Sequence, residues 1–308
     1  MKSRQTGGHV LALITVAIWG VTYIFTKLLL EHFTPTEILV MRFAISVATL
    51  FILSPKLLKL KNKRENLTFA AAGLTGVCLY YLLENIALNH TMVSNVGVIL
   101  AVAPCFTAIV NQVFAKEKEP LHKSFVVGFV IAIVGIALIS FNGATEFQLS
   151  PVGDILAILA AFSWGVYSVL SKKIASYGYH PIQSTRRILL YGFAYIIICT
   201  LVTGFSPEWT ALKDPRIVAN FLFLGVLAGG VCFVTWNMAV EKIGAIKTSV
   251  YIYLNPVITV VSSILILHER LTWMSAFGTV LTLVGLIISE NIFAHLKHKK
   301  SEYSRNLK

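Results

Sequence analysis

Residues 10–30 of the chain read VLALITVAIWGVTYIFTKLLL, a stretch in which Lys27 is the only charged residue. A helix needs about 20 mostly apolar residues to cross the hydrocarbon core of a bilayer. The stretch is too long for the apolar region of a signal peptide, and no small-residue cleavage motif follows it. We therefore predict that it is the first membrane span.

Nine further stretches of similar length and apolarity follow, and the gaps between them leave no room for a soluble domain. Only 13% of the residues are charged, against about 25% in soluble domains. The sequence predicts an all-α integral membrane protein. The motif Thr34-Pro35-Thr36-Glu37 predicts a capping box with a first-turn proline before the second span. The ten predicted spans are residues 9–30, 35–54, 68–88, 93–114, 122–142, 152–173, 182–203, 217–238, 245–267 and 272–294.

The basic residues predict the orientation. With the N-terminus inside, nineteen of the 26 Lys and Arg residues fall on the inner side and four on the outer side. The other three, Arg42, Arg186 and Arg187, lie within spans, and the last two are expected to snorkel to the interface. This bias predicts cytoplasmic N- and C-termini and a place in the cell (inner) membrane. The net charge of +12 is therefore explained without nucleic-acid binding.

An internal repeat is the strongest organisational signal. Residues 155–175 read ILAILAAFSWGVYSVLSKKIA, so that Trp164-Gly165-Val166 repeats Trp19-Gly20-Val21. Five spans per repeat is an odd number, so the second copy must enter the membrane from the opposite side. Inverted repeats are typical of secondary transporters, although duplication without alternating access remains the alternative. Later matches pair Asn85 with Asn237, Pro104 with Pro256 and Glu117 with Glu269. The expected parts are a first repeat at 9–142, a second at 152–294 and a basic cytoplasmic tail at 295–308.

These motifs, in this order, resemble the EamA family of the drug/metabolite transporter superfamily over residues 10–290. The resemblance rests on the duplicated Trp-Gly pairs, Arg42-Phe43, Ala87-Leu88, the two prolines and the segment 269–272. It implies a basket of ten helices with both termini inside. It also implies a central cavity lined mainly by spans 1, 3, 4, 6, 8 and 9. Members of that family export amino acids, nucleosides, drugs or other small metabolites.

Glu84 is the most informative single residue. An ionisable group inside a span costs several kcal/mol and indicates function by default. Tyr80 and Tyr81 lie about one turn earlier on the same helix face, so a cationic amine could meet the carboxylate and the aromatic rings together. A proton could bind there equally well. The alternative is a structural charge pair with Arg42, which lies at a similar depth in span 2, and the two interpretations can coexist.

Other aromatic and polar residues recur in both halves and are candidate substrate-binding residues. A single aromatic residue in a span more often packs against lipid or core, but recurrence favours a cavity lining. Trp236 occupies in span 8 the repeat position that Glu84 occupies in span 3. The candidates are Trp19, Thr22, Tyr23, Tyr80, Tyr81, Glu84, Asn85, Trp164, Tyr167, Trp236, Tyr251 and Asn255.

Pro104 and Pro256 are candidate hinges. A proline inside a helix removes one backbone hydrogen bond, and paired interruptions in corresponding spans point to a transport site. The alternative is a kink that serves packing alone.

The leading hypothesis is a secondary transporter, and more narrowly an exporter, of a small metabolite. An intramembrane enzyme would need clustered catalytic groups, whereas all eight His residues fall at span ends or in loops and no catalytic motif is present. A channel or receptor scaffold remains an alternative, and an ATP-driven pump is excluded within this chain by the lack of a Walker A loop. The expected partners are a small-molecule substrate and the bilayer, with protons as a candidate coupling ion. No nucleic acid, metal or cofactor is expected, and the chain should be a monomer or a homodimer.

Overall fold

The computed structural model describes residues 2–114, 123–140, 151–269 and 272–289, and within these ranges every regular element is a helix. The chain divides into two compact units. The first comprises Met1–Asn111 and Ser150–Glu269, and the second comprises Gln112–Leu149 and Arg270–Lys308. The tail at 295–308 lies outside the described residues.

Eight helices of the described chain are long and apolar enough to cross a membrane. They coincide with eight of the ten predicted spans, but several extend further, because their helices continue through polar residues beyond the apolar stretch. The third, for example, begins at Lys63 after the N-cap Asn62, rather than at residue 68. The elements of these spans are α1 (Lys2–Leu29), α2 (Pro35–Leu53), α3 (Lys63–Gly73), η1 (Leu74–Leu79), α4 (Tyr80–His90), α5 (Val93–Leu100), α6 (Ala103–Phe114), α8 (Pro151–Ala175), α9 (Pro181–Thr203), α10 (Pro215–Leu222), η3 (Phe223–Val231), α11 (Cys232–Ile243), α12 (Ala245–Ser249), η4 (Val250–Leu254) and α13 (Asn255–Leu267), with the short 3₁₀ helix η2 (Trp209–Lys213) before α10.

The predicted start of the second span is confirmed. Thr34 accepts a hydrogen bond from the Glu37 backbone N–H, and the Glu37 carboxylate accepts one from the Thr34 backbone N–H. Glu37 also accepts the backbone N–H of Ser206 at 2.9 Å. The capping box therefore also holds the loop after α9 against the start of α2.

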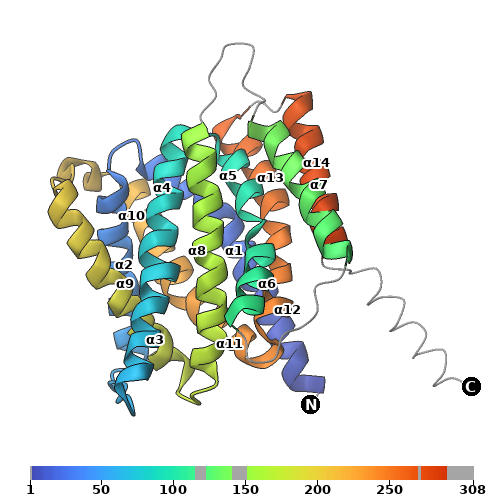
Figure 1. Cartoon of the computed structure of the whole chain (residues 1–308). Coiled ribbons are helices and arrows are strands. Elements are labelled where there is room, and N and C mark those ends of the chain that lie inside the picture. Colours follow the sequence, from blue (N-terminus) through green and yellow to red (C-terminus); the bar gives the residue numbers. More distant parts are fainter. Residues whose placement is uncertain (1, 115–122, 141–150, 270–271, 290–308) are drawn as a thin grey trace, which may run out of the picture. The chain divides into compact units, whose positions relative to one another are not determined.

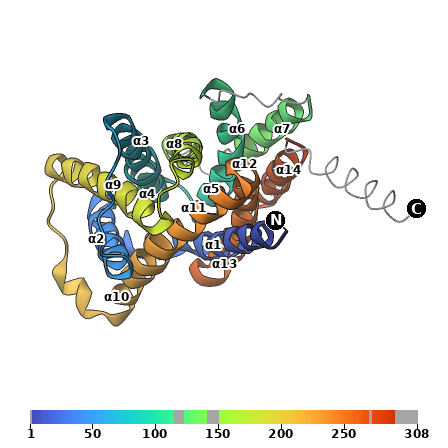
Figure 2. The same cartoon turned by 90° about the horizontal axis from the view of Figure 1, so that it is seen from below.

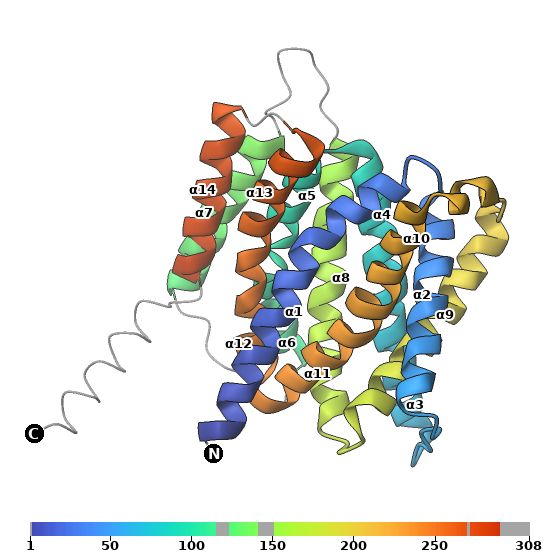
Figure 3. The same ribbon diagram turned by 180° about the vertical axis from the view of Figure 1, so that it is seen from behind.

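Within the first unit, the spans run up and down between two ends (Figures 1 and 3). α1 begins at the lower end in Figure 1, whereas α8 begins at the upper end, so the two helices run in opposite directions. The turns that follow α2 and α8 both lie at the lower end.

In the first unit, helices that correspond in the sequence repeat make corresponding contacts. α1 packs against α11 and α13, whereas α8 packs against α4 and α5. α2 contacts α9 and η3, and α9 contacts α2, α3 and η1 (Figure 2). Small residues allow the closest approaches: a Cβ on Gly20 would lie 2.7 Å from Ile258, and one on Gly165 would lie 2.9 Å from Phe106. Because Phe106 and Ile258 are themselves repeat-related, the same contact is made twice.

Four interruptions also occur in related pairs. The third and seventh long spans each contain a π-helical segment, η1 and η3, and such segments are frequent at functional sites. The fourth breaks at Ala101–Val102 between α5 and α6, and the eighth changes to the 3₁₀ helix η4 before α13. Pro104 and Pro256 are the second residues of α6 and α13, so each proline begins the helix that follows a break.

The second unit contains two apolar helices, α7 (Lys123–Ser140) and α14 (Trp273–Ser289), which pack against each other. Their contact is also reciprocal: Gly135 faces Thr282, and Gly285 faces Ala132. Both helices correspond to predicted spans, the fifth at 122–142 and the tenth at 272–294.

Candidate functional site

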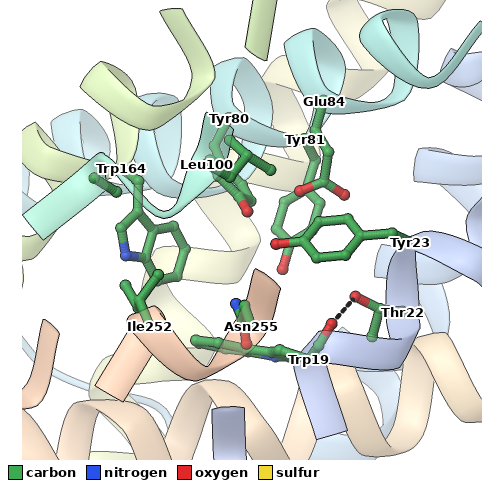
Figure 4. Close-up of a pocket in the computed structure, with 11 residues that line it drawn as sticks. Trp19, Thr22, Tyr23, Tyr80, Tyr81, Glu84, Leu100, Trp164, Ile252 and Asn255 are labelled. Carbon is green, nitrogen blue, oxygen red and sulfur yellow. Dashed lines mark hydrogen bonds between the residues drawn. The ribbon is translucent and has the colours of Figure 1, made fainter. Parts of the chain in front are cut away.

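A cavity of about 400 Å³ lies inside the first unit, where α1, α4, α8 and α13 meet (Figure 4). Eight of the twelve predicted substrate-binding residues line it. Its lining residues are Trp19, Thr22, Tyr23, Tyr80, Tyr81, Glu84, Leu100, Ala103, Trp164, Ile252 and Asn255.

The α1 wall is formed by Trp19, Thr22 and Tyr23, which share one helix face because residues three and four apart are neighbours. The Trp19 indole N–H donates to the backbone oxygen of Ala228 at 3.1 Å. The Thr22 hydroxyl donates to the backbone oxygen of Trp19 at 2.7 Å (Figure 4). These bonds fix the indole and use the hydroxyl internally, so Trp19 presents mainly an apolar surface to the cavity.

The α4 wall carries the charge. Tyr80, Tyr81 and Glu84 follow directly after the π-helical segment η1. Glu84 is 1% exposed, and its Oε1 has no hydrogen-bond partner among the described residues. The Tyr80 hydroxyl is the side-chain hydrogen-bonding neighbour of this carboxylate. The structure thus leaves one buried carboxylate oxygen facing unfilled space (Figure 4).

The predicted direct pair between Glu84 and Arg42 is not formed, since no ion pair within 4.0 Å joins them in the described chain. Arg42 is fully buried, and its guanidinium carbon lies 4.2 Å from the centroid of the Tyr81 ring. None of its guanidinium nitrogens has a hydrogen-bond partner among the described residues. The predicted pair rested on the similar depths of Arg42 and Glu84 in their spans. Depth alone does not show that the Arg42 guanidinium packs on the Tyr81 ring.

Aromatic rings close the opposite side. Trp164 of α8 lines the cavity, with its ring centroid 5.3 Å from that of Trp19 and 4.8 Å from that of Tyr80. Trp236 is fully buried, at 5.2 Å from Trp19 and 5.9 Å from Trp164. Trp236 therefore supports the lining from behind and does not reach the cavity. The span that contains it, α10–α11, contributes no lining residue.

Tyr167 also lies behind the lining. Its ring centroid is 4.9 Å from that of Trp164, and its hydroxyl donates to Asn237 Oδ1 at 2.9 Å. Asn237 accepts the Ser171 hydroxyl at 2.6 Å and donates to the Thr185 hydroxyl at 2.9 Å. A second cavity of about 300 Å³ is lined in part by Ser171 and Asn237. Tyr167 therefore contacts both a residue of the first cavity and residues of the second.

Two further predicted residues lie away from the cavity. Asn85 is fully buried, with its amide nitrogen 3.5 Å from the backbone oxygen of Pro35. The Tyr251 hydroxyl is bound to His9 Nδ1 at 2.8 Å. Asn255, one turn after Tyr251, does line the cavity. Residues four apart in an α-helix would share a face, but the 3₁₀ helix η4 turns the chain between these two, so Tyr251 and Asn255 point to different places.

The EamA-like transporter family matches residues 6–141 and again residues 151–290. The chain belongs to the EamA-like transporter family. The duplicated match agrees with the repeat read from the sequence, and the chain is a multi-pass membrane protein of this transporter family.

Relatives of this EamA-like protein are similar along nearly their whole length. An uncharacterized transporter of Archaeoglobus fulgidus is 27% identical over 286 residues, which cover 91% of this chain and 96% of that one. A probable amino-acid metabolite efflux pump of Escherichia coli is 26% identical over 300 residues, which cover 94% of this chain and 96% of that one. A solved crystal structure matches the fold with a TM-score of 0.65 at 16% identity, over 92% of this chain and 98% of that one.

The cavity of this EamA-like protein also has an apolar part, whose residues are not among the predicted ones. Leu100, Ala103 and Ile252 line the cavity on either side of the breaks that precede α6 and α13. Nothing distinguishes these residues from other apolar residues in a span. The paired prolines that follow them were the available signal. Within the described chain, no group of three or more His, Cys, Asp and Glu is placed to hold a metal ion.

Proposed function

We propose that the protein is a secondary transporter that exports a small metabolite through the cavity at α1, α4, α8 and α13. An amino acid, a nucleoside, an amine or a drug-like compound would be of the right kind. The observation that carries the proposal is a buried, incompletely bonded carboxylate facing space within membrane-spanning helices. An ionisable group within the membrane indicates a substrate or ion path by default.

Alternating access between two inverted five-helix repeats is the proposed mechanism. It is supported by the opposite directions of α1 and α8, by their reciprocal packing on α11 and α4, and by the paired helix interruptions. In this scheme α7 and α14 complete ten crossings. The repeats would span 9–142 and 152–294, with a tail at 295–308.

We place both termini in the cytoplasm and the protein in the inner cell membrane. The loop after α2, which contains the basic segment 56–64, and the end of α8 lie near the same end of the first unit as the start of α1 (Figure 1), and the last turn of α8 carries Lys172 and Lys173. Concentration of Lys and Arg at one end favours that end as cytoplasmic.

Glu84 is the proposed coupling group. A carboxylate that can take up either a proton or a cationic group lets the gradient of one drive movement of the other. Pro104 and Pro256 are the proposed hinges, because each begins the helix after a break in the cavity wall.

The test uses purified protein in proteoliposomes, with ligands chosen by a thermal-shift screen of metabolites. A carrier gives saturable flux that is accelerated by unlabelled ligand on the far side. Flux that neither saturates nor responds to that ligand would indicate a channel. Ligands that raise the melting temperature but are not transported across the membrane would indicate a receptor or an enzyme.

A further inference from the structure

We infer that the compound taken up by the cavity is a small organic cation whose ammonium group lies against Glu84. This inference rests on the proposed function, because it names the substrate class of the same cavity. It is carried by the charge of the cavity wall, its unpartnered polar atoms and its aromatic faces.

The first observation is the charge of the wall. Of the residues that line the cavity, Glu84 alone carries a formal charge. Arg42 packs on the Tyr81 ring and does not line the cavity. A ligand with an anionic group would find no cationic side chain in the wall. A cation meets a carboxylate directly.

The second observation is the hydrogen-bonding demand of the wall. Glu84 Oε1 and Asn255 Oδ1 are buried acceptors, and neither has a partner in the part of the chain that the structure describes. Both residues are more than nine-tenths buried and line the same space. A buried polar atom left unpaired costs about 1–3 kcal/mol. An ammonium group offers several donors and no acceptor, which complements two acceptors.

The third observation is the arrangement of aromatic rings. The ring of Tyr80 lies 4.7 Å from that of Tyr81 and 4.8 Å from that of Trp164, centroid to centroid. Tyr23 faces them from α1 (Figure 4). Ring faces attract cations, most strongly where water is excluded. One ring, Tyr81, already holds the Arg42 guanidinium on its surface, which demonstrates the preference within this molecule.

The body of the ligand must be compact and largely apolar. The empty space between the lining side chains is small, about 400 Å³ with the part open to solvent included. Leu100 and Ile252 line it together with the indoles. The unpartnered Trp164 Nε1 in the described chain would accommodate a single acceptor on that body. An arylalkylamine has the required charge and apolar body.

The experiment compares four probes of nearly equal shape on the purified protein in nanodiscs, at one pH. Phenethylamine is the cation, phenethyl alcohol the neutral probe, 3-phenylpropionate the anion and phenylalanine the zwitterion. Binding is measured by calorimetry and by fluorescence of the tryptophans at the cavity. The amine should bind about tenfold or more tightly than the alcohol, and the anion should bind more weakly than either.

Three variants locate the effect. Glu84→Gln should abolish the preference for the amine over the alcohol, and Glu84→Asp should retain it. Glu208→Gln is the matched control, because Glu208 is an exposed carboxylate whose neighbours are His32 and Thr210. That variant should bind as the wild type does. Circular dichroism and the melting temperature establish that each variant is folded.

Equal binding of amine and alcohol, tighter binding of phenylalanine or phenylpropionate, or no binding of any probe would each overturn the inference. So would a preference for the amine that survives in Glu84→Gln. The measurement needs no translocation. A protein that binds the amine but shows no carrier flux would refute the proposed function alone, and a carrier that ignores the amine would refute this inference alone.

Discussion

The guanidinium carbon of Arg42 lies 4.2 Å from the ring centroid of Tyr81, and Tyr81 in turn lines the cavity that contains Glu84. A fully buried arginine in a membrane-spanning helix thus packs on an aromatic ring and, within the described chain, forms no ion pair with a carboxylate. Desolvated contacts of this kind are worth about 2 kcal/mol.

This relationship gives the first prediction. In double-mutant cycles, Arg42→Gln should couple to Tyr81→Leu by about 1–2 kcal/mol, measured by unfolding in mixed micelles. Tyr81→Phe keeps the ring and should show little change. A direct buried ion pair would instead make Glu84→Gln destabilising by about 3–5 kcal/mol, with recovery in the double mutant. Stronger coupling of Arg42 to Glu84 than to Tyr81 would contradict the structure.

A second prediction concerns Glu269, which follows α13. Its two carboxylate oxygens accept the backbone N–H groups of Val93 at 2.9 Å and Ser94 at 3.2 Å, at the start of α5. A negative charge there also favours the positive end of the helix. Glu269→Ala should therefore lower stability by about 1–2 kcal/mol, and Glu269→Gln by less. Thermal melting of the purified variants checks this, and an unchanged melting temperature in Glu269→Ala would show that the cap contributes nothing.

A third prediction concerns the prolines. Pro104→Ala and Pro256→Ala should each lower the transport rate while leaving membrane insertion intact, because each lets a helix form across a break that borders the cavity. The measurement is flux in proteoliposomes, corrected for the amount of folded protein. Pro151→Ala is the control, because Pro151 is the first residue of α8 and does not line the cavity. Wild-type flux in both cavity variants would reduce the prolines to packing kinks.

Much of the fold could be predicted, because each membrane span is visible in the sequence as a stretch of about 20 mostly apolar residues. The capping box at Thr34 and Glu37 was predictable for the same reason, since its chemistry is local. Arg186 shows the limit. It was expected to snorkel to the interface, but it is 1% exposed and donates to the backbone oxygens of Ser54 and Lys56 after α2. These hydrogen bonds join parts of the chain that are far apart in the sequence, so no local sequence pattern predicts them.

The site was predictable where helical periodicity extends without interruption. Trp19, Thr22 and Tyr23 share a face of a continuous α-helix, and all three reach the cavity. Tyr251 and Asn255 span a 3₁₀ segment, so the same reasoning put Tyr251 on the wrong face. Trp236 was placed at the right depth, but depth cannot separate a lining residue from one that packs directly behind it.

A fourth prediction concerns topology. Reporter fusions at Lys61, Lys118 and Gly178 should read cytoplasmic, and fusions at His90, Gly143 and Gly204 should read external, since each pair of neighbouring sites is separated by an odd number of spans. Of these positions, Lys118 and Gly143 lie outside the described residues. An external reading at Lys61 would reverse the orientation. Readings on the same side at Lys61 and His90 would remove the third crossing.

We propose that transport through the cavity depends on the Glu84 carboxylate, and the flux of the Glu84→Gln variant measures that dependence. This change keeps the shape of the side chain and removes its charge. Uptake and efflux of a ligand found by the thermal-shift screen would be measured across pH in proteoliposomes, for Glu84→Gln, for Glu84→Gln with Arg42→Gln, and for the control Glu208→Gln. We expect the Glu84→Gln variant and the double variant to fold but to lack coupled transport, and we expect Glu208→Gln to transport as the wild type does. Wild-type rates and pH dependence in Glu84→Gln, or recovery of transport when Arg42→Gln is added, would contradict this proposal.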